Sequence, residues 1–106
     1  MDKWDNSTTE DLFKTILDLK NVSEAKRFFR DLLTEQEIIE FGKRWQVAKM
    51  LNQNIPYAKI EKATGLSSRT VARVAKWLTQ GMGGYQLMLK RLAHHHNPSS
   101  FGKGLS

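Results

Sequence analysis

Apolar residues recur every three or four positions along most of this chain of 106 residues, which is the spacing that lines one face of an α-helix. No convincing run alternates between apolar and polar residues, as a half-buried β-strand would require. Serine, threonine and asparagine precede several of the apolar stripes, and these residue types cap helix N-termini. The sequence therefore predicts an all-α protein of about six helices.

Capping motifs predict where the first three helices begin. Residues 7–10 (STTE) and 34–37 (TEQE) match the capping box, in which a hydroxyl accepts from a backbone N–H and a glutamate reaches back. The first box puts the cap of the first helix at Ser7, and Asn21 is expected to cap the second helix. The third helix should end before Pro56, because proline disfavours helical geometry in the residue before it.

Glycine and proline residues predict the bounds of the other three helices. The spacing predicts a short helix over residues 57–64, stopped by Gly65, and a fifth helix over residues 68–80, stopped by the glycine-rich run 81–84. A sixth amphipathic helix should follow from about Tyr85 to Leu92. We expect one folded domain over residues 1–93 and a disordered tail over 94–106, where Asn, Pro, Ser, Gly and His dominate.

Composition limits the class of protein. The hydrophobic fraction of 40% suits one domain with a modest core and is too high for a disordered chain. No apolar run approaches the ~20 residues that cross a bilayer, and no signal-peptide pattern opens the chain. Cysteine is absent, which excludes disulfides and a cysteine nucleophile. A cytoplasmic protein is the expectation.

The positive charge is concentrated in the second half of the chain. The formal net charge is +6, yet residues 1–33 have a net charge of −1 and residues 34–58 cancel. Residues 59–106 hold eight basic residues and a single acidic one, Glu61. A basic surface favours a polyanionic partner, because neutralised phosphates release counterions. The alternative is a basic face that serves only solubility.

Residues 57–78 have the apolar spacing of a helix-turn-helix, with Ile60, Leu66, Val71 and Val74 directed inward. Two short helices meet at a sharp angle in this motif, and a glycine at the turn, here Gly65, accommodates a positive φ. Ser67 or Ser68 can cap the second helix. The alternative is a helical hairpin that serves only packing.

Outward positions of the second helix of the motif are small, hydroxylated or basic, as suits a helix in the major groove of duplex DNA. Arginine can donate two hydrogen bonds to guanine, and serine and threonine reach phosphates or bases. With two lysines of the preceding helix, the candidate DNA-binding residues are Lys59, Lys62, Ser67, Ser68, Arg69, Thr70, Ala72, Arg73 and Lys76.

The run GLSSRTVARV at 65–74 resembles the G-[LIV]-S-x-x-T-V-x-R-V pattern of bacterial DNA-binding helix-turn-helices, although Glu61 stands where alanine is usual. With LTE at 33–35 and GKR at 42–44, the stretch from about Leu12 to Leu92 resembles the Trp-repressor superfamily, and within it the YerC/YecD group. The resemblance implies an intertwined homodimer whose first three helices interlock, with two recognition helices on one face. Independently, the chain has more aromatic residues than one slender core readily hides: Phe13, Phe28, Phe29, Phe41 and Trp45.

The same resemblance implies where a tryptophan corepressor would bind, between the third helix and the recognition helix. Thr34, Arg44 and Arg73 match the threonine and arginine positions of that pocket, but Val74 and Trp77 replace its small residues. A valine and an indole would occupy the volume of the ligand. Trp77 is then either a built-in substitute for the ligand or an ordinary core residue, and both interpretations predict that free tryptophan does not bind.

Other kinds of site have less support in the sequence. The run His94-His95-His96 could bind a transition metal, but the three histidines are adjacent and no cysteine or carboxylate accompanies them, so a solvated tail is favoured. No nucleophile elbow, phosphate loop or paired-carboxylate motif appears, so we expect neither an enzyme nor a cofactor. The leading hypothesis is a dimeric DNA-binding transcriptional regulator. The alternative is a helical module that binds protein or RNA and retains a vestigial helix-turn-helix.

Overall fold

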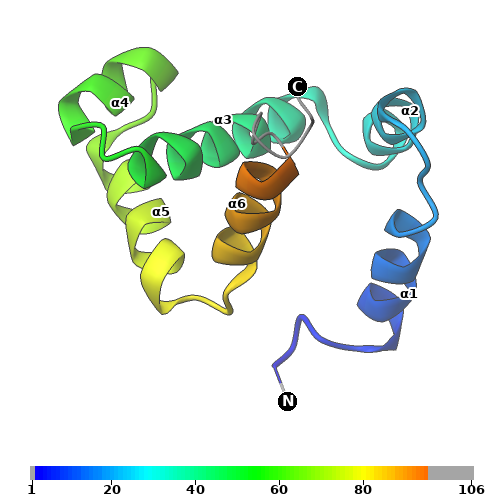
Figure 1. Cartoon of the computed structure of the whole chain (residues 1–106). Helices are drawn as coiled ribbons and strands as arrows, with labels where there is room; N and C mark the ends of the chain where they lie inside the picture. The colour runs from blue at the N-terminus through cyan, green and yellow to red at the C-terminus, as the bar shows by residue number, and fades with distance from the viewer. Residues whose placement is uncertain (1, 96–106) are drawn as a thin grey trace. The chain divides into compact units, whose positions relative to one another are not determined.

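The computed structural model describes residues 2–95 and contains six helices and no strand among them (Figure 1). The helices are α1 (Ser7–Ile16), α2 (Val22–Leu32), α3 (Glu35–Asn52), α4 (Tyr57–Thr64), α5 (Ser68–Gln80) and α6 (Gly84–His95). The predicted all-α class is confirmed, and α4 and α5 have the bounds that the sequence predicted. No helix among the described residues is long and apolar enough to span a membrane.

The chain divides into two compact units after Ile39, a division that the sequence did not predict. The first unit contains α1, α2 and the start of α3. No residue of α1 or α2 is buried. The second unit contains the rest of α3 together with α4, α5 and α6, and it has a buried apolar core: Val47, Ala48, Ile60, Val71 and Val74.

Capping hydrogen bonds fix the starts of the helices in the first unit. The predicted caps of α2 and α3 are confirmed: Asn21 accepts from the backbone N–H of Glu24 at 2.9 Å, and the box of Thr34 and Glu37 forms at 2.9 and 3.1 Å. The predicted cap of α1 at Ser7 is wrong, because Asn6 takes that role.

In α1 the Asn6 side chain accepts from the backbone N–H of Thr9, and the Asn6 N–H donates to the Thr9 hydroxyl, both at 3.0 Å. Asparagine caps a helix as well as serine does. The second hydrogen bond of the capping box, which the sequence predicted from Glu10, is instead made by the hydroxyl of Thr9.

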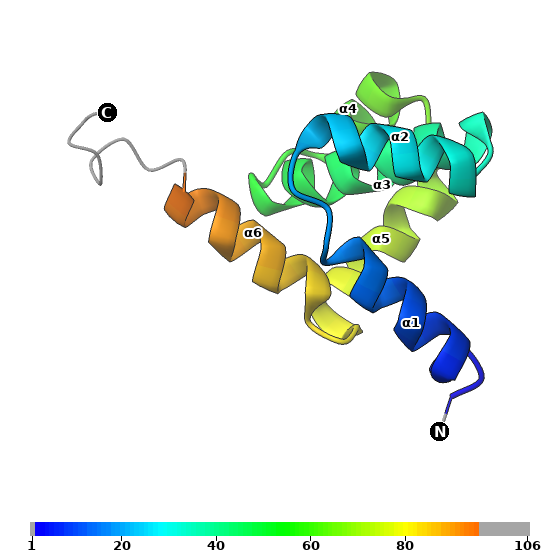
Figure 2. The same cartoon turned by 90° about the vertical axis from the view of Figure 1, so that its right-hand side faces the viewer.

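The core of the second unit lies where α3, α4 and α5 meet. In Figure 1, α5 leads away from the end of α3, and α6 returns toward α3 after the glycine-rich turn; Figure 2 shows the same helices turned by 90°. The rings of Trp45 on α3 and Tyr85 on α6 are stacked, with centroids 6.3 Å apart. The Gln86 side chain donates to the carbonyl oxygen of Leu78 at 3.0 Å, which joins α6 to the last turns of α5.

The last helix is longer than predicted. α6 continues through His95, so His94 and His95 are helical and do not belong to a tail. Helix-breaking residues come only at Asn97 and Pro98, which explains why the helix passes its expected end at Leu92. The rest of the expected tail, residues 96–106, lies outside the described residues.

Candidate nucleic-acid interface

The turn between α4 and α5 depends on a glycine and a buried threonine. Gly65 has φ 74°, in the left-handed region that favours glycine, and its N–H donates to the carbonyl oxygen of Glu61 at 2.8 Å. The buried hydroxyl of Thr64 donates to the carbonyl oxygen of Ile60 at 2.8 Å and accepts from the N–H of Leu66 at 3.2 Å. These hydrogen bonds fix the direction in which α5 starts. Thr64 was not among the residues predicted from the sequence to matter for the site.

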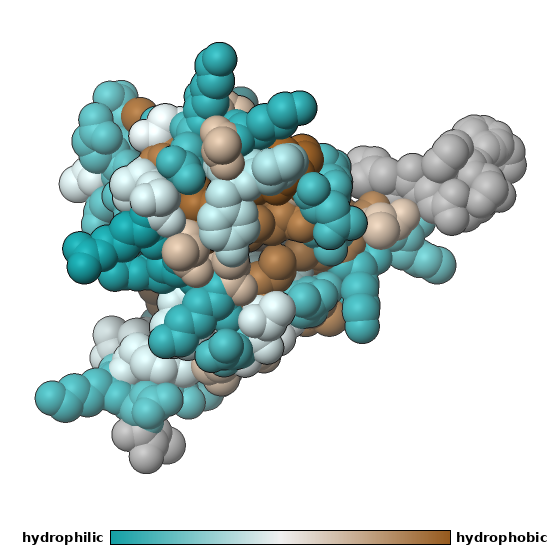
Figure 3. All heavy atoms as spheres, turned by 90° about the vertical axis from the view of Figure 1, so that its left-hand side faces the viewer, coloured by the Kyte–Doolittle hydropathy of each residue, from teal (hydrophilic) through white to brown (hydrophobic). Residues whose placement is uncertain are grey.

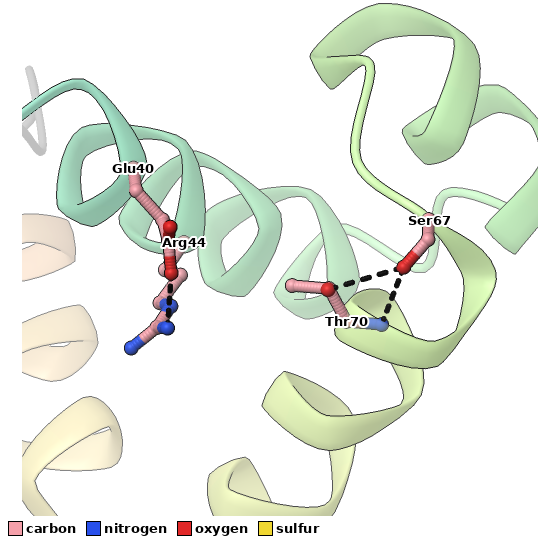
Figure 4. Close-up of polar contacts among 4 residues, drawn as sticks. All are labelled: Glu40, Arg44, Ser67 and Thr70. Carbon is pink, nitrogen blue, oxygen red and sulfur yellow. Dashed lines mark hydrogen bonds and ion pairs between the residues drawn. The ribbon is translucent and has the colours of Figure 1, made fainter. Parts of the chain in front are cut away.

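Ser67 caps the N-terminus of α5. Its hydroxyl accepts from the backbone N–H of Thr70 at 3.2 Å and lies 3.2 Å from the Thr70 hydroxyl (Figure 4). Both side chains belong to the predicted DNA-binding set. Because Ser67 and Thr70 hydrogen-bond to each other, they define the start of the helix. Thr70 is half-buried, which corrects its predicted outward position.

The other predicted contact residues of α5 share an exposed face. Ser68, Arg69, Ala72, Arg73 and Lys76 are exposed, whereas Val71 and Val74 on the opposite side are buried in the core. Lys59 and Lys62, on α4, are also exposed. The helix-turn-helix thus presents its small and basic residues outward and its apolar residues inward, as the spacing predicted.

The positive charges of this face are not neutralised by ion pairs within the described part of the chain. The ion pairs among residues 2–95 join Lys14 to Glu10 and Arg44 to Glu40, and neither includes a residue of α4 or α5. No acidic residue occurs from Lys62 to His95. Lys76 lies over the ring of Trp77, with its Nζ 5.3 Å from the centroid. The face therefore suits an anionic partner.

Comparisons with known proteins agree with this geometry. A family model described as Trp repressor protein matches residues 7–93. The chain belongs to the Trp repressor family. The uncharacterized protein YerC of Bacillus subtilis (strain 168) is 39% identical over 100 residues, which are 94% of this chain and 96% of that one. Both the resemblance to this family and the resemblance to YerC, which were predicted from the sequence, are confirmed.

Two solved structures share the fold. A TrpR like protein from Eubacterium eligens ATCC 27750 is 40% identical with a TM-score of 0.83, over 86% of this chain and 94% of that chain. A candidate Trp repressor from Staphylococcus aureus is 40% identical with a TM-score of 0.81, over 85% of this chain and 90% of that chain. Proteins of the Trp repressor family are regulatory DNA-binding proteins and not enzymes, as expected here.

Residues that match the corepressor pocket of the Trp repressor family have other partners here. Arg44 forms an ion pair with Glu40 one turn earlier on α3 (Figure 4). Its guanidinium carbon also lies 5.7 Å from the ring centroid of Phe41. Arg73 is exposed on α5, and Val74 is 3% exposed within the core. Thr34 belongs to the first unit, where it caps α3. The polar residues that match the pocket are present, but Val74, in place of a small residue, is part of the core.

Trp77 is not a core residue within one chain, which corrects one of the two interpretations of this residue. Its side chain is 48% exposed and borders an apolar concavity of about 730 Å³. The concavity is lined by Trp45, Trp77, Gln80, Gly81, Met82, Gly84, Tyr85 and Met88. After the glycine-rich turn α6 returns toward α3 (Figure 1), and Trp77 near the end of α5 remains exposed, which periodicity alone did not reveal.

Two further features concern side chains outside α5. Lys43 of α3 is half-buried, and its Nζ lies beside the Gly65 turn. Its spacing of four residues from buried Val47 could have indicated this position.

Of the histidine run, His96 lies outside the described residues. Within residues 2–95 no three His, Cys, Asp or Glu side chains gather as metal ligands would.

Proposed function

We propose that this protein is a transcriptional regulator that binds duplex DNA as a homodimer and recognises its sequence through the exposed face of α5. The observation that carries the proposal is the division of α5 into two faces. Val71 and Val74 anchor the helix in the core, while Arg69, Arg73 and Lys76 extend from the opposite side without ion pairs in the described residues. Membership of the Trp repressor family supports this function.

The homodimer is supported by the apolar faces of the first unit. In α1 and α2 every residue keeps part of its surface exposed, including large apolar side chains such as Phe13 and Leu32. Large exposed apolar patches on a folded protein mark interaction surfaces. A second copy that covers these faces would supply the core that α1 and α2 lack.

Selection of binding sites from a random duplex pool tests this function. Two recognition helices related by a two-fold axis should enrich a palindrome whose half-sites are centred about 34 Å apart, one helical turn of DNA. Enrichment of a single unrepeated site would contradict the dimeric geometry. If an RNA pool run in parallel were enriched and the duplex pool were not, the RNA-binding alternative would replace this proposal.

Free L-tryptophan is not expected to bind or to change the affinity for DNA. Val74 occupies the core beside Arg73, and a site that is already filled costs about 1–3 kcal/mol or more to overpack. Calorimetric titration with millimolar L-tryptophan should therefore show no saturable heat. A micromolar dissociation constant would contradict this prediction and would indicate a repressor that senses tryptophan.

The double variant Trp77→Ser with Val74→Gly sharpens this prediction, because it restores small residues at both positions. If Trp77 acts in place of a ligand, DNA binding by this variant should depend on an added indole compound. The variant should also be less stable, since it removes the buried valine side chain from the core. DNA binding that is unchanged without any indole compound would rule out the substitute role.

A further inference from the structure

We propose that Lys43, a residue of α3, binds a backbone phosphate of the DNA beside the start of α5. This inference rests on the proposed function and extends the DNA-binding surface to a third helix. Lys43 is not among the contacts predicted from the sequence, because α3 lies outside the helix-turn-helix motif.

The position of the Lys43 ammonium carries the proposal. Its Nζ lies 4.0 Å from the point that a Cβ on Gly65 would occupy. Gly65 ends α4, and the cap of α5, Ser67, comes two residues later. Lys43 therefore brings a positive charge from α3 to the junction of the two helices that form the motif, where the predicted contact surface of α5 begins.

The local electrostatics leave this charge available to an anion. Neither ion pair of residues 2–95 includes Lys43, and no side-chain hydrogen bond of Lys43 occurs among the described residues. The side chain is half-buried, so part of it remains accessible to a ligand.

The chemistry of lysine favours a phosphate contact over a base contact. Its ammonium is a compact charge with three donors on a flexible stem, and it lacks the planar fork with which arginine recognises guanine. Contacts to phosphates set the position of a protein on the duplex and carry no sequence information. Lys43 should therefore raise affinity for all sequences equally while it helps to position α5.

A salt titration of DNA binding measures this contact directly. Each phosphate contact contributes about 0.9 to the slope of log affinity against log salt, so a dimer that loses two contacts should lose about 1.8. Between 50 and 200 mM salt, wild-type affinity should fall about 12-fold more than that of Lys43→Ala. The loss should be the same for a selected duplex and for a scrambled one, and Lys43→Arg should restore most of the slope.

Lys49→Ala is the matched control. Lys49 lies on the same helix and is exposed, but six residues place it about 240° around the helix from Lys43. The slope of log affinity against log salt for Lys49→Ala should equal that of the wild-type protein. Thermal unfolding of each variant separates a contact with DNA from a purely structural role at the end of α4, because a structural role would lower stability and leave the slope unchanged.

The outcomes distinguish this inference from the proposed function. If wild-type protein binds no duplex, both fail. If wild-type protein binds its selected duplex and folded Lys43→Ala shows the wild-type slope, the role of Lys43 fails and the proposed function stands. If Lys43→Ala reduced the slope of log affinity against log salt for the selected duplex only, the inference would also be overturned, because this result would indicate contact with a base.

Discussion

Both units of the chain contain amphipathic helices, but they bury their apolar residues to very different extents. In the second unit five apolar side chains form a core, whereas no residue of α1 or α2 is buried. Figure 3 shows hydrophobic residues that reach the surface among hydrophilic ones. Hydrophobic periodicity therefore indicates which face of a helix is apolar, but it does not indicate whether the same chain or a second copy covers that face.

The largest expected effect concerns the core of the second unit. Ile60 is fully buried between the helices of the motif, so Ile60→Ala should lower the free energy of unfolding by about 2–5 kcal/mol. Urea unfolding followed by circular dichroism measures this change. Met82→Ala is the control, because Met82 is 85% exposed and its removal should change stability by less than about 0.5 kcal/mol. Similar losses in both variants would contradict the assignment of this core.

The first unit should respond differently, because its apolar faces are proposed to be covered by a second copy. Phe28→Asp places a charge on the apolar face of α2 and should convert the dimer into a monomer at micromolar concentration. Sedimentation equilibrium measures the mass, and Arg27→Ala on the exposed face of α2 should leave it unchanged. A wild-type protein that is itself monomeric would show that no second copy covers α1 and α2.

A smaller effect is expected at the start of α5. Ser67→Ala removes the acceptor for the Thr70 N–H, and loss of such a cap costs about 0.5–2 kcal/mol. Asn21→Ala makes the same change at the start of α2. Both should lower the melting temperature, but only Ser67→Ala should also weaken DNA binding, since every proposed DNA contact lies in the second unit. Equal DNA affinity in the two variants would remove this distinction between the units.

Local motifs made much of the fold predictable. The bounds of α4 and α5 follow from Pro56, Gly65 and Ser67, whose preferences act over one or two residues. The cap of α1 was misplaced by one residue because Asn6 and Ser7 are both good caps, and only the geometry of Thr9 decides between them.

The candidate site was less predictable, because burial depends on how helices pack. Periodicity placed Arg69 and Arg73 on the exposed face of α5, but it could not show that Thr70 is drawn into the cap with Ser67. The exposure of Trp77 and the approach of Lys43 to Gly65 depend on the placement of α6 and α3 against the motif, which no short stretch of sequence encodes.

The most direct test of the central claim, that α5 recognises DNA sequence, is the affinity of Arg69→Ala for duplexes selected by the wild-type protein. Arg69 is exposed near the start of α5, so its loss should cost about 1–3 kcal/mol and relax the preference at one base pair in each half-site. Lys76→Ala, measured alongside, should weaken binding to all sequences alike. If Arg69→Ala kept both the affinity and the sequence preference of the wild-type protein, recognition through this face of α5 would be contradicted.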